Sequence, residues 1–294
     1  MGGAARFAPP AFILLWSSAF VAARAGLPDV SPLYFLFLRF AIASSALLLL
    51  ASVVKQNWSS LRGRWHHFAM AGMLINGVYL ACSYIAMTRI SAATMALMGS
   101  LHPIGVALLS GPLLGDRFRP AQWAGFAVGI AGVVLVVGIK AGDFAAREGL
   151  LWAGFGVAAF VAGTLHYSRF CRGGDLVPAN AVQLTSAGIL AGLAALVFED
   201  AHAAWTLSAV ATLLYLTFAI SLGGMALLLF MLRTGQAGKV AANFYLTSGT
   251  TAALGWLFLG EALGWLQIAG FALATAGVWL VNRAPTDSAS RKSN

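Results

Sequence analysis

The sequence predicts an all-α integral membrane protein, and its composition carries this prediction. Of the 294 residues, 60% are hydrophobic and only 9% are charged, whereas a soluble domain carries about 25% charged residues. One helical span needs about 20 apolar residues, so the chain has room for about ten spans and for no additional soluble domain. The long apolar runs exclude an outer-membrane barrel, whose strands would alternate between apolar and polar residues.

The apolar runs define ten expected transmembrane helices. We place them at 9–26, 32–54, 66–86, 91–113, 120–139, 148–168, 178–197, 206–232, 236–259 and 263–281. Proline tolerates the first turn of a helix because its missing N–H has no partner there. Four prolines stand at or near the expected starts, namely Pro9, Pro32, Pro120 and Pro178.

The distribution of basic residues predicts the orientation. The loops on one side hold Arg6, Lys55, Arg62, Arg64, Arg117, Arg119, Arg169, Arg172, Arg233, Lys239, Arg283, Arg291 and Lys292. The loops on the other side hold Arg24, Arg89, Lys140 and Arg147. Cytoplasmic loops carry the excess of Lys and Arg, so we expect a multi-pass protein of the cell inner membrane with both termini in the cytoplasm. The net charge of +9 therefore reflects topology, and we expect no nucleic-acid partner.

An internal repeat divides the chain into two halves, 1–143 and 144–294. Residues 114–136 read LGDRFRPAQWAGFAVGIAGVVLV, and residues 259–281 read LGEALGWLQIAGFALATAGVWLV. The offset of 145 residues spans five expected helices. Because five is odd, the second half should be inverted, as in many secondary transporters with a substrate site near the midplane. The arginines of 116–119 are absent from 261–264, as an inversion requires.

The repeated motif resembles a known family. Each half ends in leucine-glycine-acid, a short turn and alanine-glycine-phenylalanine, which is similar to the drug/metabolite transporter superfamily and its EamA-type branch with ten helices. Residues 16–20 (WSSAF) and 38–41 (LRFA) are also similar to that pattern. The resemblance covers nearly the whole chain and implies a secondary transporter akin to exporters of amino acids and other metabolites. The motifs single out no substrate.

The fourth and ninth expected helices carry matched side chains. Met98, Leu101 and His102 share one helical face, and Asn243 and Thr247 lie 145 residues after Met98 and His102. We expect these residues to line a cavity between the halves. Hydrogen bonding between membrane helices is the alternative.

Two positions in the same helices predict a bend or hinge. Pro103 removes one backbone hydrogen bond and frees the carbonyl of Gly99, and Gly249 is its looser counterpart in the ninth helix. A purely structural kink is the alternative.

Further candidates for substrate contact lie at comparable depth in other helices. They are Trp16 and Phe20 in the first, Asn76, Tyr79 and Ser83 in the third, and Phe155 and Phe160 in the sixth. Aromatic rings can stack on an apolar or aromatic substrate group, while core packing or lipid contact is the alternative. Asn76 corresponds to Ser221 across the repeat.

The charged residues bear on the substrate and its energetics. Arg39 lies within the second expected helix, where an arginine is a functional candidate by default. It is expected either to bind a carboxylate or line the exit path, or to act structurally by satisfying carbonyls or snorkelling to the interface. The acidic residues all fall in loops or at helix ends, namely Asp29, Asp116, Asp143, Glu148, Asp175, Glu199, Asp200, Glu261 and Asp287. We therefore expect a neutral or zwitterionic substrate, with facilitated movement at least as favoured as proton coupling.

The favoured function is export of small amphipathic metabolites, foremost aromatic or apolar amino acids, by alternating access. A lipid or lipid-precursor flippase of the same fold is the first alternative. An integral membrane enzyme is less favoured, because His66 and His67 lack acidic partners. The expected partners are the substrate and the lipid bilayer, without metal or cofactor. Small residues at 125, 129 and 132 and at 270, 274 and 277 indicate close helix packing, within a monomer or at a homodimer contact.

Overall fold

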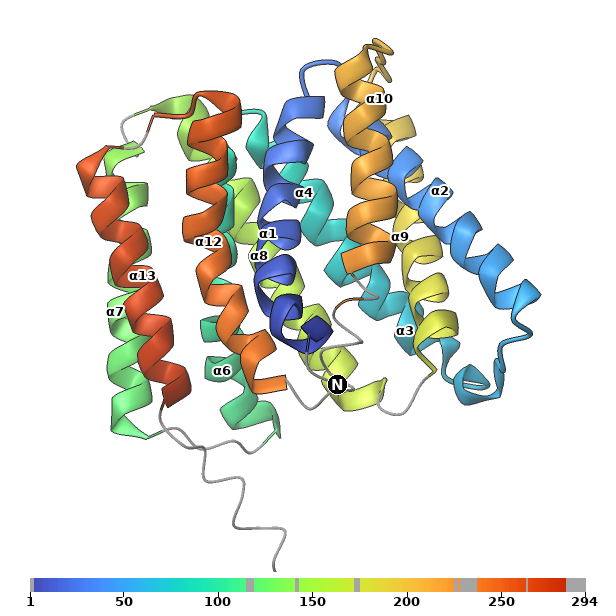
Figure 1. Cartoon of the computed structure of the whole chain (residues 1–294), viewed down its shortest axis with the longest axis horizontal. Coiled ribbons are helices and arrows are strands. Elements are labelled where there is room, and N and C mark those ends of the chain that lie inside the picture. Colours follow the sequence, from blue (N-terminus) through green and yellow to red (C-terminus); the bar gives the residue numbers. More distant parts are fainter. Residues whose placement is uncertain are drawn as a thin grey trace, which may run out of the picture.

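The computed structural model describes residues 3–114, 119–140, 143–171, 175–224, 227, 237–262 and 264–283. They form a bundle of long helices (Figure 1). The first half contains α1 (Gly3–Gly26), α2 (Pro32–Val53), η1 (Ser59–Leu61), α3 (Trp65–Gly72), η2 (Met73–Val78), α4 (Tyr79–Met87), α5 (Ala92–Gly99), α6 (Leu101–Leu114) and α7 (Pro120–Lys140). The second contains α8 (Phe144–Phe170), α9 (Leu176–Phe198), α10 (Leu207–Leu214), η3 (Tyr215–Gly224), α12 (Ala237–Leu259) and α13 (Trp265–Arg283).

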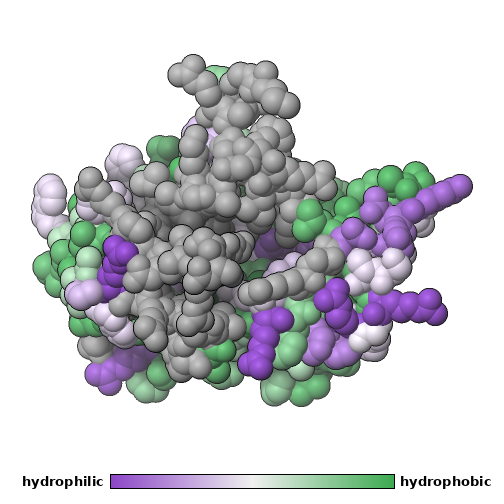
Figure 2. Space-filling view, turned by 90° about the horizontal axis from the view of Figure 1, so that it is seen from below, coloured by the Kyte–Doolittle hydropathy of each residue, from purple (hydrophilic) through white to green (hydrophobic). Residues whose placement is uncertain are grey.

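The all-helical membrane fold predicted from composition is confirmed. Within the described ranges the one extended pairing is an isolated antiparallel bridge between Val30 and Ala203. In the part of the chain that the structure describes, seven helices are long and apolar enough to cross a membrane, and two shorter apolar helices lie at Pro120–Val136 and Trp265–Gly277. Seen from the lower end of Figure 1, hydrophilic residues project from that end and hydrophobic patches lie around its edge (Figure 2). Ten crossings and their inversion stay predictions.

The helix starts show where the proline argument succeeds and where it fails. Pro32 and Pro120 are the first residues of α2 and α7. The start expected at Pro9 was wrong, because α1 begins at Gly3 and contains Pro9 and Pro10. A proline removes one backbone hydrogen bond, and this helix of 24 residues tolerates that loss near its beginning.

Two membrane helices contain π-helical segments, which the sequence did not predict. One is η2, Met73–Val78, and the other is η3, Tyr215–Gly224. Adding the repeat offset of 145 to 73–78 gives 218–223, which lies inside η3. In a π-helical turn, each backbone N–H bonds to the carbonyl five residues earlier. Such turns are rare and often occur at functional sites. The two halves therefore share this deviation at equivalent positions.

The small-residue stripe packs inside the molecule. Helices α7 and α13 are related by the repeat and lie against each other (Figure 1). A Cβ atom added to Gly132 would lie 2.5 Å from the Ala274 nitrogen and 2.6 Å from the Gly270 oxygen. A Cβ atom added to Gly277 would likewise meet the backbone of Gly129 and of Gly125. The stripe therefore serves close helix packing within one chain.

Two carboxylates of the second half cap helices of the first half. The Glu199 side chain accepts hydrogen bonds from the Leu33 and Tyr34 N–H groups at the start of α2, at 2.9–3.1 Å. Glu261 accepts from the N–H groups of Ala92 and Ala93 at the start of α5, at 2.8 and 3.3 Å. A helix N-terminus leaves N–H groups unpaired and favours negative charge. These contacts join the two halves of the chain at one end of the bundle.

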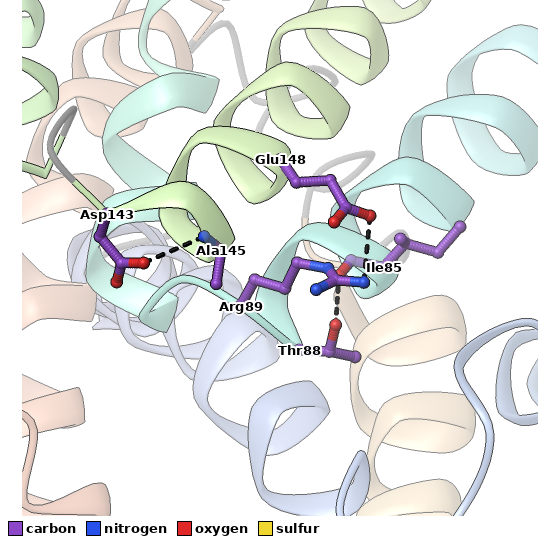
Figure 3. A network of polar contacts seen from close by, with 6 residues as sticks. All are labelled: Ile85, Thr88, Arg89, Asp143, Ala145 and Glu148. Carbon is purple, nitrogen blue, oxygen red and sulfur yellow. Dashed lines mark hydrogen bonds and ion pairs between the residues drawn. The ribbon is translucent and has the colours of Figure 1, made fainter.

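A more exposed polar network lies beside the start of α8 (Figure 3). Arg89 and Glu148 form an ion pair at 3.0 Å, and both side chains are 39% exposed. Asp143 caps α8 by accepting a hydrogen bond from the Ala145 N–H at 3.0 Å. Exposed ion pairs contribute little to stability, so this network serves mainly to shape the helix end.

Candidate functional site

A cavity of about 310 Å³ lies between the two halves of the chain. Ligand pockets in proteins have volumes of about 300–1,000 Å³. The first half contributes Trp16, Ala19, Phe20, Ala23, Arg39, Phe40, Ile75, Asn76, Tyr79, Leu80, Ser83, Tyr84 and Met87. The second half contributes Phe160, Asn180, Gln183, Leu184, Ile220 and Ser221. The wall is thus mainly aromatic and aliphatic, with a few amide and hydroxyl groups and one guanidinium.

Seven of the residues singled out from the sequence lie around this cavity. They are Trp16, Phe20, Asn76, Tyr79, Ser83, Phe160 and Arg39. Asn76 lies in η2 and its repeat counterpart Ser221 lies in η3. Both π-helical segments therefore place a polar side chain at the cavity.

Other predicted residues lie elsewhere in the bundle. Met98 is buried in the core, and Leu101 packs against that core. The Thr247 side chain is buried, and its carbonyl accepts a hydrogen bond from the Ser17 hydroxyl at 3.1 Å, which joins α12 to α1. Phe155 is 62% exposed and does not line this cavity. The side chain of Asn243 lies outside the described residues.

His102 supports the cavity wall from behind. Its ring stacks on Phe160, with ring centroids 3.7 Å apart, and Phe160 stacks in turn on Tyr79 at 4.5 Å. The His102 Nε2 atom is 2.9 Å from the hydroxyl of Thr164. Of the three rings, Tyr79 and Phe160 line the cavity and His102 does not. The stack ties α6 to α8 and α4 at this wall.

Arg39 is held in the interior rather than at a membrane interface. Its side chain is only 6% exposed. Nε donates to the Ser221 hydroxyl at 3.1 Å and Nη1 donates to the Tyr84 hydroxyl at 2.9 Å. The guanidinium also lies over the Phe40 ring, 5.6 Å from its centre. The sequence left open whether the Arg39 side chain snorkels to the membrane surface. A buried guanidinium bonded to two interior hydroxyl groups does not fit that alternative.

Sequence reasoning missed three polar residues of the wall. Asn180 and Gln183 are buried on α9, and Tyr84 is buried on α4. The two amides had a visible signal, since they are polar residues within an apolar run of 23 residues, Leu176–Phe198. Tyr84 had none, because its role depends on the distant Arg39.

The expected bends have different outcomes. The fourth expected helix is interrupted at Ser100, between α5 and α6. Pro103 lacks the N–H that would bind the carbonyl of Gly99, which accounts for a break one turn before it. Near Gly249, by contrast, α12 runs without interruption from Ala237 to Leu259.

The described residues contain no group of three or more His, Cys, Asp or Glu side chains placed to hold a metal ion. Cys82 and Cys171 are both free and buried. The site therefore offers stacking surfaces, hydrogen-bond partners and one cation for a bound molecule. Among the residues around it we find no arrangement of a nucleophile with a general base.

A bundle of apolar helices with such a cavity between two related halves is typical of a membrane transporter. The chain belongs to the EamA-like transporter family, whose model matches it twice, at residues 11–138 and 147–283.

Two of the relatives described here match most of its length, and a third matches half of it. It is 28% identical to a "Probable terminal-alkyne amino-acid exporter" of Streptantibioticus cattleyicolor, over 92% of this chain and 91% of the relative. It is 26% identical to the "Uncharacterized transporter YdfC" of Bacillus subtilis, over 90% and 86%. It is 29% identical to the "Aromatic amino acid exporter YddG" of Ancylobacter novellus, over 50% and 55%. A solved structure titled "Crystal structure of protein" shares the fold, with a TM-score of 0.66, 21% identity, and coverage of 94% and 96%.

Proposed function

We propose that this transporter exports small amphipathic metabolites, foremost amino acids with aromatic or apolar side chains, through the cavity described above. The cavity wall is the observation that carries the proposal. Trp16, Phe20, Tyr79 and Phe160 present aromatic surface, on which an aromatic substrate side chain can stack. Asn76, Asn180, Gln183 and Ser83 offer oxygen and nitrogen atoms that can hold an ammonium or a carboxylate.

The names of two relatives support the same substrate class. One is described as a terminal-alkyne amino-acid exporter and another as an aromatic amino acid exporter. Both substrates combine an amino acid head with an apolar end. The cavity of this chain has the same combination of apolar and polar groups.

Transport of amino acids is tested directly with the purified chain in proteoliposomes. Vesicles loaded with unlabelled phenylalanine should accumulate labelled phenylalanine from outside by counterflow, and unlabelled methionine or leucine should compete. Empty vesicles are the control. Vesicles that show no counterflow with any amino acid of the panel, but move a fluorescent phospholipid between leaflets, would replace this proposal by the flippase.

We further propose that the two halves are inverted in the inner membrane, with both termini in the cytoplasm. The family model matches each half, and the π-helical segments recur at the same offset. Helix α1 begins and α13 ends at the same end of the bundle (Figure 1). A reporter fused after Asp29 should report the exterior, and one fused after Arg172, which follows the first helix of the second half, should report the cytoplasm. The same side for both fusions would contradict the inversion.

A further inference from the structure

The charge of the cavity is unbalanced. Among the described residues that line the cavity, Arg39 alone carries a permanent charge, and the others are neutral. Both hydrogen bonds of its guanidinium go to hydroxyl groups. No salt bridge to Arg39 exists within the described part of the chain. A charge in an apolar interior is costly unless an opposite charge or hydrogen bonds compensate it.

Six of the seven carboxylates that the structure describes have polar partners at the ends of the bundle, Asp143 among them, and the seventh, Asp200, is exposed after the end of α9. Glu199 and Glu261 cap α2 and α5. Three others have polar partners there: Asp29 accepts from the Thr206 hydroxyl at 2.5 Å, Asp175 from the Ser60 hydroxyl at 3.0 Å, and Glu148 pairs with Arg89. Among the described residues, therefore, no carboxylate serves as the counter-charge for Arg39.

The donors around Arg39 leave room for an acceptor. A guanidinium has five N–H groups, and the hydrogen bonds to Ser221 and Tyr84 use two of them. Ser221 donates its own hydrogen to the Leu216 carbonyl at 3.1 Å. The Tyr84 hydroxyl accepts from Arg39, and among the described residues it has no acceptor for its own hydrogen. Arg39 and Tyr84 therefore present unused donors side by side at the cavity wall.

We propose that Arg39 and Tyr84 form a subsite that binds the carboxylate of the transported molecule. This proposal rests on the proposed function and specifies its substrate class as amphipathic monocarboxylates. The carboxylate accepts hydrogen bonds from the free N–H groups of Arg39 and from the Tyr84 hydroxyl. The aromatic wall around Phe20 and Phe160 receives the apolar part. The substrate ammonium is dispensable, and molecules that carry only a positive charge are rejected by Arg39.

Competition with phenylalanine analogues separates the two substrate charges. We would measure inhibition of phenylalanine counterflow by 3-phenylpropionate, which keeps the carboxylate, and by phenethylamine, which keeps only the ammonium. The acid should compete nearly as well as phenylalanine. The amine should be weaker by roughly ten- to a hundredfold, the range that corresponds to a hydrogen bond with a charged group. Equal inhibition by both analogues would overturn the proposal.

Variants of Arg39 and Tyr84 test whether these residues cause the preference for the acid over the amine. Arg39→Met should abolish the difference between the acid and the amine, while Arg39→Lys should retain part of it, because lysine keeps the charge without the planar set of donors. Tyr84→Phe should reduce acid binding by about tenfold, since it removes one donor. Arg89→Met is the matched control, because Arg89 pairs with Glu148 at the bundle end and does not line this cavity.

A binding readout keeps this subsite distinguishable from the transport function. The melting temperature of the detergent-solubilised chain should rise with 3-phenylpropionate for the wild type and for Arg89→Met, and less for Tyr84→Phe. If the acid raises the melting temperature but no amino acid is transported, the subsite stands and the proposed function falls. If phenylalanine is transported and Tyr84→Phe and Arg39→Lys both keep wild-type selectivity, the function stands and the subsite falls. If Arg39→Met does not fold, Tyr84→Phe and Arg39→Lys still test the subsite.

Discussion

Replacing Gly132 with valine is expected to lower the melting temperature of the purified protein by about 5–10 °C. The new Cβ would meet backbone atoms of Gly270 and Ala274 at 2.5–2.6 Å, and backbone atoms cannot turn away as a side chain can. Helices α7 and α13 would have to separate. Overpacking of this kind costs about 1–3 kcal/mol and occasionally more, and each kcal/mol corresponds to about 2–4 °C in a protein of this size class.

The control is the same substitution at a glycine with free space. Gly154 lies on α8, and a Cβ atom built there meets nothing within 4 Å. Gly154→Val should therefore melt within a few degrees of the wild type. Melting is followed by intrinsic fluorescence in detergent. A Gly132→Val protein as stable as Gly154→Val would show that α7 and α13 do not pack as described.

Replacing Phe160 with alanine should raise the KM for phenylalanine roughly tenfold or more. Phe160 lines the cavity and is the middle ring of the stack with Tyr79 and His102. Its loss removes two aromatic pairs, each contributing about 0.5–1.5 kcal/mol beyond its buried area. It also leaves Tyr79 without its support at the cavity wall. Initial rates of counterflow at varied phenylalanine concentration give the KM and the maximal rate separately.

Phe155 provides a control on the same helix. Its side chain is 62% exposed on the outside of α8. Phe155→Ala removes the same atoms without touching the cavity, so its KM should match that of the wild type. An equal rise in KM for both variants would mean that the effect comes from α8 as a whole and that the stack does not form the binding wall.

Hydrophobic runs predicted the helices well because helix existence depends on local sequence. The second expected helix, 32–54, is observed at Pro32–Val53. The small residues at equivalent positions of α7 and α13 also predicted close helix packing, and the structure shows that these two helices pack against each other. Both inferences needed only the spacing of residues along the chain.

Which side of a helix faces the cavity was harder to predict. Phe155 and Phe160 are five residues apart, so at 3.6 residues per turn they point about 140° apart. Phe155 and Phe160 therefore could not both face one cavity, and their spacing in the sequence was enough to show it. For His102 the obstacle was the break at Ser100, which separates α6 from α5. The π-helical segments likewise shift the phase of the third and eighth helices, and no residue pattern signalled them.

The carboxylate subsite proposed at Arg39 has an electrical consequence for the transport cycle. Arginine stays with the protein, so a monocarboxylate that binds there carries one negative charge across the membrane when it leaves. In a cell whose interior is negative, outward movement of that charge is favoured by about 2.3 kcal/mol for each 100 mV, which corresponds to a concentration ratio of roughly fiftyfold. The voltage does no work on a zwitterion. The proposed carboxylate subsite thus implies that the membrane potential itself drives the expulsion of acids, without a side chain that carries protons.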